Sequence, residues 1–123
     1  GNNKAPTFEC QNESDLYTTS GSEQGNKALT YPIGLISLDE AWYAGGSSTN
    51  QSYYLYTGQN YWTMSPSYFF SGYARVFRVY SNGSLNSSGV DYSWGVRPVI
   101  NLKADVTISG GNGTSDSPYV IAT

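Results

Sequence analysis

The chain has 123 residues and a formal net charge of −3, and its six Lys and Arg residues are scattered along the sequence. This argues against nucleic-acid binding, because phosphate recognition needs clustered cations. No apolar run reaches the length of a membrane span, and the absence of His removes the usual base for Ser or Cys nucleophiles and the commonest zinc ligand. The composition therefore predicts a protein that is not an enzyme, with no catalytic residues, no metal-binding residues, no nucleic-acid partner and no membrane insertion by this fragment.

Aromatic residues make up 15% of the chain, with 12 Tyr and 3 Trp, whereas charged residues make up only 12%. Charged residues average about 25% of a soluble domain, so solubility here depends on Ser, Asn, Thr and Gly. Such an uncharged polar surface is typical of extracellular β-proteins. The single Cys10 allows no internal disulfide, and the length fits one domain held together by packing.

The chain divides at about residue 27. Residues 1–27 are polar and predict a loosely ordered N-terminal arm, whereas residues 28–123 predict a single β-rich domain. The first expected strand is 28–36, and Pro32 confines it to a sheet edge or a bulge.

One short helix is expected at residues 38–44. Ser37 and Glu40 have the spacing of a capping box, in which each side chain bonds the backbone amide of the other residue. Gly45 and Gly46 follow as a C-terminal stop. Within this helix, Trp42 is expected on the buried face.

The centre of the chain predicts a sheet. Residues 74–80 alternate with apolar side chains on both faces, which is typical of an interior strand, and Asn82-Gly83 favours a type I′ hairpin turn. Residues 53–56 and 61–64 (ended by Pro66) are each expected to be a short strand or an extended segment. The other expected strands are 85–90, 94–102, 106–108 and 119–121, with an aromatic loop at 67–73. The pattern as a whole predicts an α+β fold that is mostly antiparallel β-sheet.

Several stretches together resemble a known group of proteins. Trp62–Pro66, Val76–Tyr80, Asn82–Ser84 and Trp94–Leu102 are similar to a Trp-x-x-Ser-Pro … Gly-Val-Arg-Pro signature of bacterial surface proteins of unknown function. Tyr31–Ile36 and Gly110–Ile121 resemble C-terminal regions of pilin-like proteins from gut Firmicutes.

The resemblance spans residues 29–121. It implies a C-type-lectin-like fold, an extracellular location on the surface of a Gram-positive bacterium, and structural roles for Trp62, Gly95 and Arg97. Met64 departs from the family pattern, which has Leu followed by Arg. The sulfatase-modifying enzymes of related fold act through cysteines, and Cys10 lies outside the matching region, so their activity is not implied.

Arg97 and the loop at residues 110–116 are candidate sites. A half-buried Arg in an apolar strand needs an acidic partner, and Asp39 or Glu40 is expected to supply it. The alternative is that Arg97 binds a ligand. Gly110–Asp116 faintly resembles a calcium-binding repeat, but a single copy predicts a turn. No cofactor is expected, although calcium bound by Asn, Asp and carbonyl oxygens stays open.

The aromatic loops carry the functional prediction. Rings set among Ser, Gly and Asn are typical of recognition loops, where rigid rings supply area and small polar residues supply hydrogen bonds. Tyr68, Tyr73 and Tyr92 are therefore the predicted ligand-binding residues, while Tyr54, Phe69 and Trp94 are expected in the core. One hypothesis is a recognition or adhesion domain that binds a host glycan or protein through loops 65–73 and 86–94. The alternative is the globular head of a pilus subunit, whose aromatic residues pack against neighbouring subunits.

Overall fold

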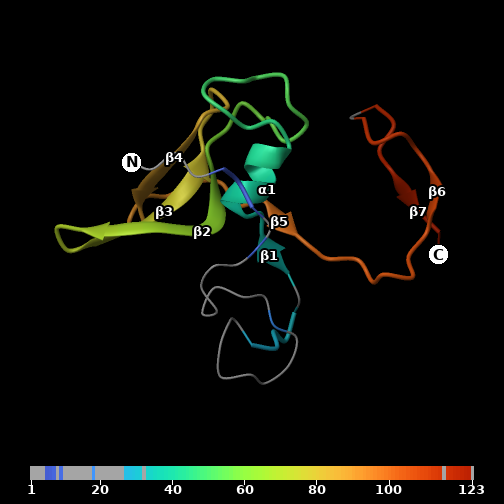
Figure 1. Cartoon of the computed structure of the whole chain (residues 1–123), viewed down its shortest axis with the longest axis horizontal. Helices are drawn as coiled ribbons and strands as arrows, with labels where there is room; N and C mark the ends of the chain where they lie inside the picture. The colour runs from blue at the N-terminus through green and yellow to red at the C-terminus, as the bar shows by residue number, and fades with distance from the viewer. Residues whose placement is uncertain are drawn as a thin grey trace.

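The computed structural model describes residues 5–7, 9, 18, 27–31, 33–114 and 116–122, so most of the predicted N-terminal arm, including Cys10, lies outside the described residues. The described residues form an α+β fold of mostly antiparallel strands with one short helix (Figure 1), as predicted. The elements in chain order are β1 (Gly34–Leu35), α1 (Leu38–Tyr43), β2 (Tyr61–Phe70), β3 (Tyr73–Val79), β4 (Leu85–Gly89), β5 (Pro98–Val99), β6 (Ile108–Gly110) and β7 (Val120–Ile121).

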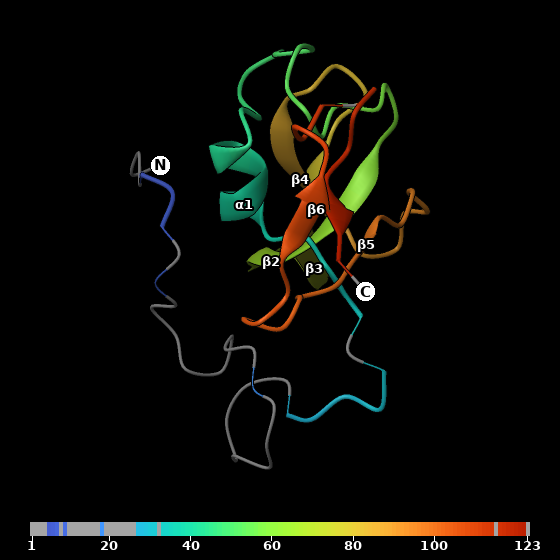
Figure 2. The ribbon, with the colours of Figure 1, turned by 90° about the vertical axis from the view of Figure 1, so that its right-hand side faces the viewer.

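The central sheet has three antiparallel strands in the order β2-β3-β4, so β3 is the interior strand that its two-sided apolar pattern predicted. Its register pairs Tyr61 with Val79 and Phe77 with Ser87. A second, two-stranded sheet pairs β1 with β5, and helix α1 packs beside the central sheet (Figure 2). The long strands expected at 28–36 and 94–102 were wrong, because only two residues of each enter this second sheet.

Helix α1 begins with the predicted capping box. The Ser37 hydroxyl accepts from the Glu40 amide at 3.1 Å, and the Glu40 carboxylate accepts from the Ser37 amide at 2.8 Å. Ala41, fully buried, is the residue through which the helix meets the core. Trp42 was expected on the buried face and is instead exposed, because the close approach at Ala41 turns the neighbouring side chain outward.

Strand β2 was expected to end before Pro66. It instead continues through Pro66 to Phe70. β2 is an edge strand of the central sheet, where the missing amide of a proline is tolerated. The register shifts between Trp62 and Pro66, and there the buried Thr63 hydroxyl donates to the Phe77 carbonyl at 2.8 Å. A side-chain hydrogen bond thus joins β2 to β3 where the ladder is irregular.

The two hairpin turns of the sheet differ from the prediction. Ser71 and Gly72 both have positive φ, at 50° and 84°, which is the pattern of a type I′ turn. At the second turn only Gly83 has positive φ, and its amide donates to the Tyr80 carbonyl at 2.9 Å. The Asn82-Gly83 turn is therefore a type I turn with a glycine bulge, and the type I′ geometry lies at the other hairpin.

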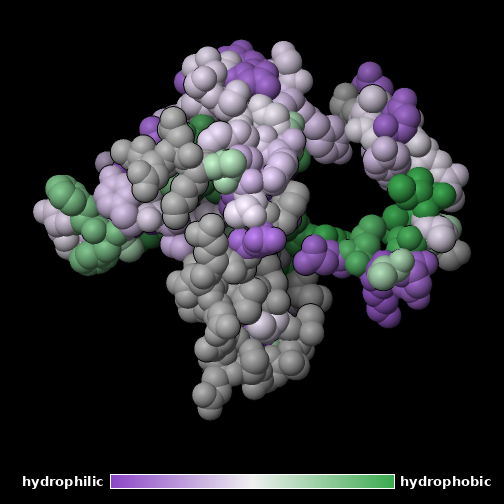
Figure 3. Space-filling view, in the orientation of Figure 1, coloured by the Kyte–Doolittle hydropathy of each residue, from purple (hydrophilic) through white to green (hydrophobic). Residues whose placement is uncertain are grey.

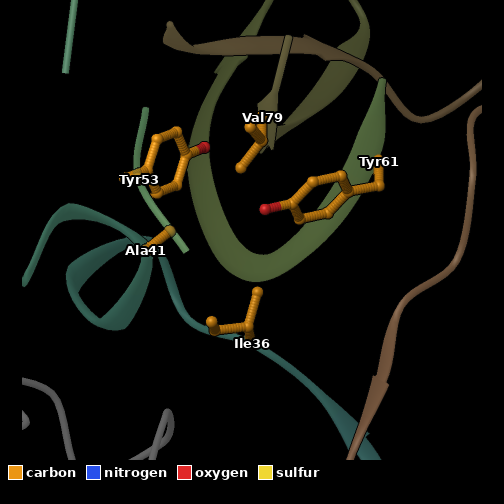
Figure 4. Packing of buried hydrophobic residues seen from close by; sticks show 5 residues of the cluster. All are labelled: Ile36, Ala41, Tyr53, Tyr61 and Val79. Carbon is orange, nitrogen blue, oxygen red and sulfur yellow. The ribbon is translucent and has the colours of Figure 1, made fainter. Parts of the chain in front are cut away.

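Among the residues that the structure describes, the core contains five buried hydrophobic residues: Ile36, Ala41, Tyr53, Tyr61 and Val79 (Figure 4). The segment 53–56 was expected to be a short strand or an extended segment and is instead a turn, closed by a hydrogen bond from the Tyr56 amide to the Tyr53 carbonyl at 3.0 Å. The turn places Tyr53 inside and leaves Tyr54 exposed, contrary to the prediction for Tyr54. Burial raises the pKa of the Tyr53 hydroxyl above its ordinary value, and the neighbouring Tyr61 adds to the effect.

The C-terminal segment forms a separate hairpin. Strands β6 and β7 pair only with each other, and Figure 1 shows them standing away from the central sheet at the end of an extended connection. Among the described residues, no helix is long and apolar enough to span a membrane.

Candidate functional site

The first candidate surface is the hairpin tip, which we define as Tyr68, Phe69, Phe70 and Tyr73. These four aromatic side chains are between 53% and 72% exposed. Phe69 was expected in the core, but it lies on the exposed end of the β2–β3 hairpin, visible as the apolar projection at the left of Figure 3. Tyr68 and Phe70 contact edge to face, with ring centroids 6.5 Å apart.

The hairpin tip projects because β4 is shorter than its neighbour. The ladder between β3 and β4 ends where Arg75 pairs with Gly89, and the Val90 amide adds one further bond to the Ala74 carbonyl at 3.1 Å. Beyond that point, β2 and β3 pair only with each other, at Phe69 with Ala74 and at Phe70 with Tyr73. The tip is therefore a two-stranded ribbon whose aromatic residues have no further layer to cover them.

The second candidate surface is a stack of one cation and three rings, which we call the arginine stack: Tyr80, Arg78, Trp94 and Tyr92. The Arg78 guanidinium carbon lies 3.6 Å from the Tyr80 ring centroid and 4.2 Å from that of Trp94. Tyr92 stacks on Trp94, with centroids 5.9 Å apart and planes 9° from parallel. Tyr92 is exposed, as predicted. Trp94 was expected in the core but is only half-buried and does not belong to the core cluster.

The structure does not bring the three predicted ligand-binding residues into one cluster. Tyr68 and Tyr73 lie on the hairpin tip, whereas Tyr92 lies in the loop after β4, against Trp94. Sequence reasoning did not identify Arg78, which is only 6% exposed, as a candidate site residue. One signal in the sequence could have identified it. Arg78 stands among Val76, Phe77 and Val79 in the predicted interior strand, where both faces of the sheet are covered in part.

Arg97 binds other parts of the domain, as expected, but its partners are a backbone carbonyl and an aromatic ring and not an acidic side chain. Its Nη1 donates to the Leu55 carbonyl at 2.7 Å, and its guanidinium lies 5.6 Å from the Tyr61 ring centroid. The predicted pairing with Asp39 or Glu40 was wrong, and both carboxylates accept hydrogen bonds from backbone amides instead. Asp39 accepts from the Thr7 amide at 3.0 Å, and Glu40 caps the helix.

Gly95 and Trp62 join the loop before β5 to the central sheet. The Trp62 amide donates to the Gly95 carbonyl and the Gly95 amide donates to the Asn60 carbonyl, both at 3.0 Å. A side chain at position 95 would bring its Cβ within 2.9 Å of the Asn60 carbonyl oxygen, which explains the glycine. Both residues therefore hold the backbone that leads into and out of the arginine stack.

The glycine-rich loop after β6 is a turn, as its single copy predicted. The Asn112 side chain accepts from the Thr114 amide at 3.2 Å and from the Thr114 hydroxyl at 2.8 Å. Across the part of the chain that the structure describes, no group of three or more His, Cys, Asp or Glu side chains is placed to hold a metal ion.

Together, the fold and the two aromatic surfaces define a small antiparallel α+β domain with exposed rings at one end of its central sheet. The chain belongs to the family described as "Domain of unknown function (DUF6273)", which matches residues 7–104. No curated protein and no solved structure matches the chain.

The family match includes residues on both sides of the expected domain boundary. At its N-terminal end, the Thr7 amide binds Asp39, and the Tyr43 hydroxyl donates to the carbonyl of the preceding Pro6 at 2.7 Å, so this part of the chain contacts helix α1. At its C-terminal end, the match stops before β6. The β6–β7 hairpin, which stands apart in Figure 1, lies outside the matched residues.

Proposed function

We propose that this chain is a non-catalytic recognition domain of an extracellular bacterial surface or pilin-like protein, and that it binds a host glycan or protein through its exposed aromatic residues. The hairpin tip is the observation that carries the proposal. Exposed apolar groups that gather on a soluble domain mark interaction sites, and four exposed rings stand here on the two strand ends that flank the Ser71-Gly72 turn. A C-type-lectin-like relationship is part of the same proposal.

The chemistry of the hairpin tip suits recognition. Its rings are rigid and lose little conformational entropy on binding, while the neighbouring Ser67, Ser71 and Gly72 are small and adaptable. Arg75 lies with its guanidinium carbon 5.5 Å from the Tyr68 ring centroid and donates two hydrogen bonds to Ser87, which holds the base of the tip in place. Exposed rings of this kind stack on sugar faces and on apolar protein side chains alike.

The proposal is tested by binding of the purified chain to an array of host glycans and to mucin. Replacing both Tyr68 and Tyr73 with Ser is expected to reduce binding at least roughly tenfold, on the scale of losing two aromatic contacts. Tyr31, which is 76% exposed and belongs to neither aromatic surface, supplies the matched control. Equal binding by the Tyr68→Ser/Tyr73→Ser variant and the Tyr31→Ser variant would remove the hairpin tip from recognition.

A second candidate is the head of a pilus subunit, and the β6–β7 hairpin favours it. Ile108, Tyr119, Val120 and Ile121 are all exposed on this hairpin. A two-stranded hairpin is marginally stable in water by itself, so packing against a neighbouring subunit would stabilise it. Mechanical shearing of cells that express the native protein tests this candidate. Recovery in high-molecular-weight filaments supports a subunit, and retention on the cell body contradicts it.

A further inference from the structure

The arginine stack contains hydrogen-bond donors that have no acceptor. Nε and Nη1 of Arg78 and Nε1 of Trp94 are buried and make no hydrogen bond with any residue that the structure describes. Buried polar groups are nearly always paired in folded proteins, and a buried charge without a counter-charge is costlier than a buried neutral group. These three donors lie within one stack, since the Arg78 guanidinium carbon is 4.2 Å from the Trp94 ring centroid.

The ring contacts do not remove this deficit. Cation–π contacts with Tyr80 and Trp94 stabilise the positive charge of Arg78. They give the N–H groups of Nε and Nη1 no acceptor atom. A bridging water would accept hydrogen bonds but would leave the positive charge without a counter-charge. An anion with more than one acceptor oxygen satisfies both needs, and a carboxylate does so with the geometry that guanidinium groups prefer.

We propose that the arginine stack is a binding site for the carboxylate of an acidic sugar, such as a hexuronate residue of a glycan. The inference rests on the recognition function proposed above and names the ligand class for this second surface. The carboxylate of one hexuronate accepts from Arg78 and from the Trp94 indole, and a neighbouring sugar of the same glycan lies against Tyr92, which is 58% exposed and stacked on Trp94.

The surroundings favour a sugar over an acidic peptide. Asn86, which pairs with Arg78 across β3 and β4, is exposed, and so is Ser93 beside Tyr92. Both are neutral hydrogen-bonding groups that suit sugar hydroxyls. A peptide carboxylate would instead favour further cations around Arg78. The other Arg of β3, Arg75, already donates to Ser87.

Access to Arg78 requires movement of its cover. Trp94, whose ring centroid lies 4.2 Å from the Arg78 guanidinium carbon, belongs to the loop at residues 91–94, which lies outside the regular strands. At one end of this loop the Val90 amide bonds Ala74, and at the other Gly95 bonds Trp62 and Asn60. The proposal requires a shift of this loop between these two fixed ends when the ligand binds.

The direct test is nuclear magnetic resonance on the 15N-labelled chain, titrated with tri-galacturonic acid and, in parallel, with the neutral trigalactose. The Trp94 indole and Arg78 Nε–H signals, assigned with the Trp94→Phe and Arg78→Lys variants, are expected to move downfield with the acidic sugar only. The exposed Trp42 of helix α1 provides an internal reference that should stay in place, whereas Trp62 pairs with Arg78 across β2 and β3 and does not serve as one. Unmoved Trp94 and Arg78 signals would overturn the proposal.

Affinity measurements on variants separate this site from its alternatives. Arg78→Met is expected to weaken tri-galacturonic acid binding by roughly tenfold or more, the scale of a charge-assisted hydrogen bond. Lys103→Met removes the same charge from an exposed position outside the strands and is expected to leave the affinity within about twofold, as salt screening limits distant charges. If Arg78→Met does not fold, Tyr92→Ala, a change at an exposed ring, is expected to weaken binding several-fold through lost stacking.

The outcomes also separate this inference from the proposed function. Glycan binding that requires Tyr68 and Tyr73 but is unchanged in Arg78→Met would keep the recognition function and overturn the acidic-sugar site. Equal downfield shifts with acetate or with a Glu-containing peptide would overturn the assignment to a sugar. Loss of the Trp94 shift in Arg78→Met, with trigalactose inert throughout, would support it.

Discussion

The two ends of strand β2 have opposite environments although both are rich in aromatic residues. Tyr61, at the first position, is 3% exposed and lies in the core with Val79, whereas Phe69, near the last position, is 72% exposed at the hairpin tip. The first end is covered by helix α1 and by the turn that carries Tyr53; the last end extends beyond β4 and has no cover. Burial in this domain is therefore decided by what lies above the strand, and the type of side chain alone does not determine it.

The rings at the two ends of β2 contribute differently to folding and, we propose, to function. Rings at the covered end supply the volume of a core that has few Leu and Ile residues, while rings at the uncovered end add surface that contributes little to folding. A domain that exposes large apolar groups at a tip gains nothing in stability from them, which is why we assign them to recognition. Three predictions test this division, taken in order of expected effect.

The largest effect is expected for Tyr61→Ala. The change removes a buried ring, its hydrogen bond to the Leu55 carbonyl at 3.1 Å and its contact with Arg97, and should lower the free energy of unfolding by about 3–5 kcal/mol. Urea denaturation followed by Tyr and Trp fluorescence measures the loss. Tyr61→Phe is the matched control and should cost only about 1 kcal/mol, for the hydrogen bond. A loss below about 1 kcal/mol in Tyr61→Ala would show that this end of β2 is not the core.

The second prediction concerns Tyr53, which is buried at the same end with no hydrogen-bond partner for its hydroxyl. Because the pKa of Tyr53 is raised in the folded protein, the folded state keeps the proton after the unfolded chain loses it. The associated stability is complete below pH about 10 and falls as the pH rises further, by about 1.4 kcal/mol per pH unit.

Tyr53→Phe should remove this part of the alkaline loss and leave stability at pH 7 unchanged or higher by about 1 kcal/mol, because an unpaired buried hydroxyl is removed. Urea denaturation of both proteins between pH 7 and pH 11 measures the difference. Tyr54→Phe, at the exposed neighbouring position, should behave like the unmodified protein. Parallel alkaline losses in the Tyr53→Phe variant and the unmodified protein would contradict the burial of this hydroxyl.

The smallest effect is expected at the uncovered end. Phe69→Ala should change the free energy of unfolding by less than about 0.5 kcal/mol, as is usual for a surface substitution. The same denaturation experiment measures it, and binding of host glycans should fall in the same variant. A stability loss as large as that of Tyr61→Ala would mean that the hairpin tip is covered, and the recognition surface would lose its residues.

Features set by local chemistry were predictable from the sequence. The Ser37–Glu40 capping box and the glycines that follow the helix act within a few residues, so helix α1 was located closely. The alternation in 74–80 likewise identified the interior strand, because both faces of that strand are apolar whatever covers them. The prediction that Tyr68, Tyr73 and Tyr92 are exposed was also confirmed.

Other features needed contacts between distant parts of the chain. Tyr53 and Tyr54 are identical neighbours, and only the turn that carries Tyr53 toward Val79 distinguishes the buried ring from the exposed one. The type I′ turn lies at Ser71-Gly72 and not at Asn82-Gly83, although Asn-Gly is the stronger local pattern. At the second turn, a Cβ on Gly83 would collide with the backbone of Asn50, so the packing of that loop adds to the choice of turn.

The sequence by itself determined the α+β class, the helix and the interior strand, since each depends on periodicity and on hydrogen bonds between near neighbours. Only the tertiary structure decided which rings are buried, that Arg97 binds a carbonyl, and that Arg78 lies between Tyr80 and Trp94. Those outcomes depend on where the segments 53–56 and 91–94 pack against the central sheet. The packing of the whole domain sets these positions, so the residues next to each other in the sequence do not determine them.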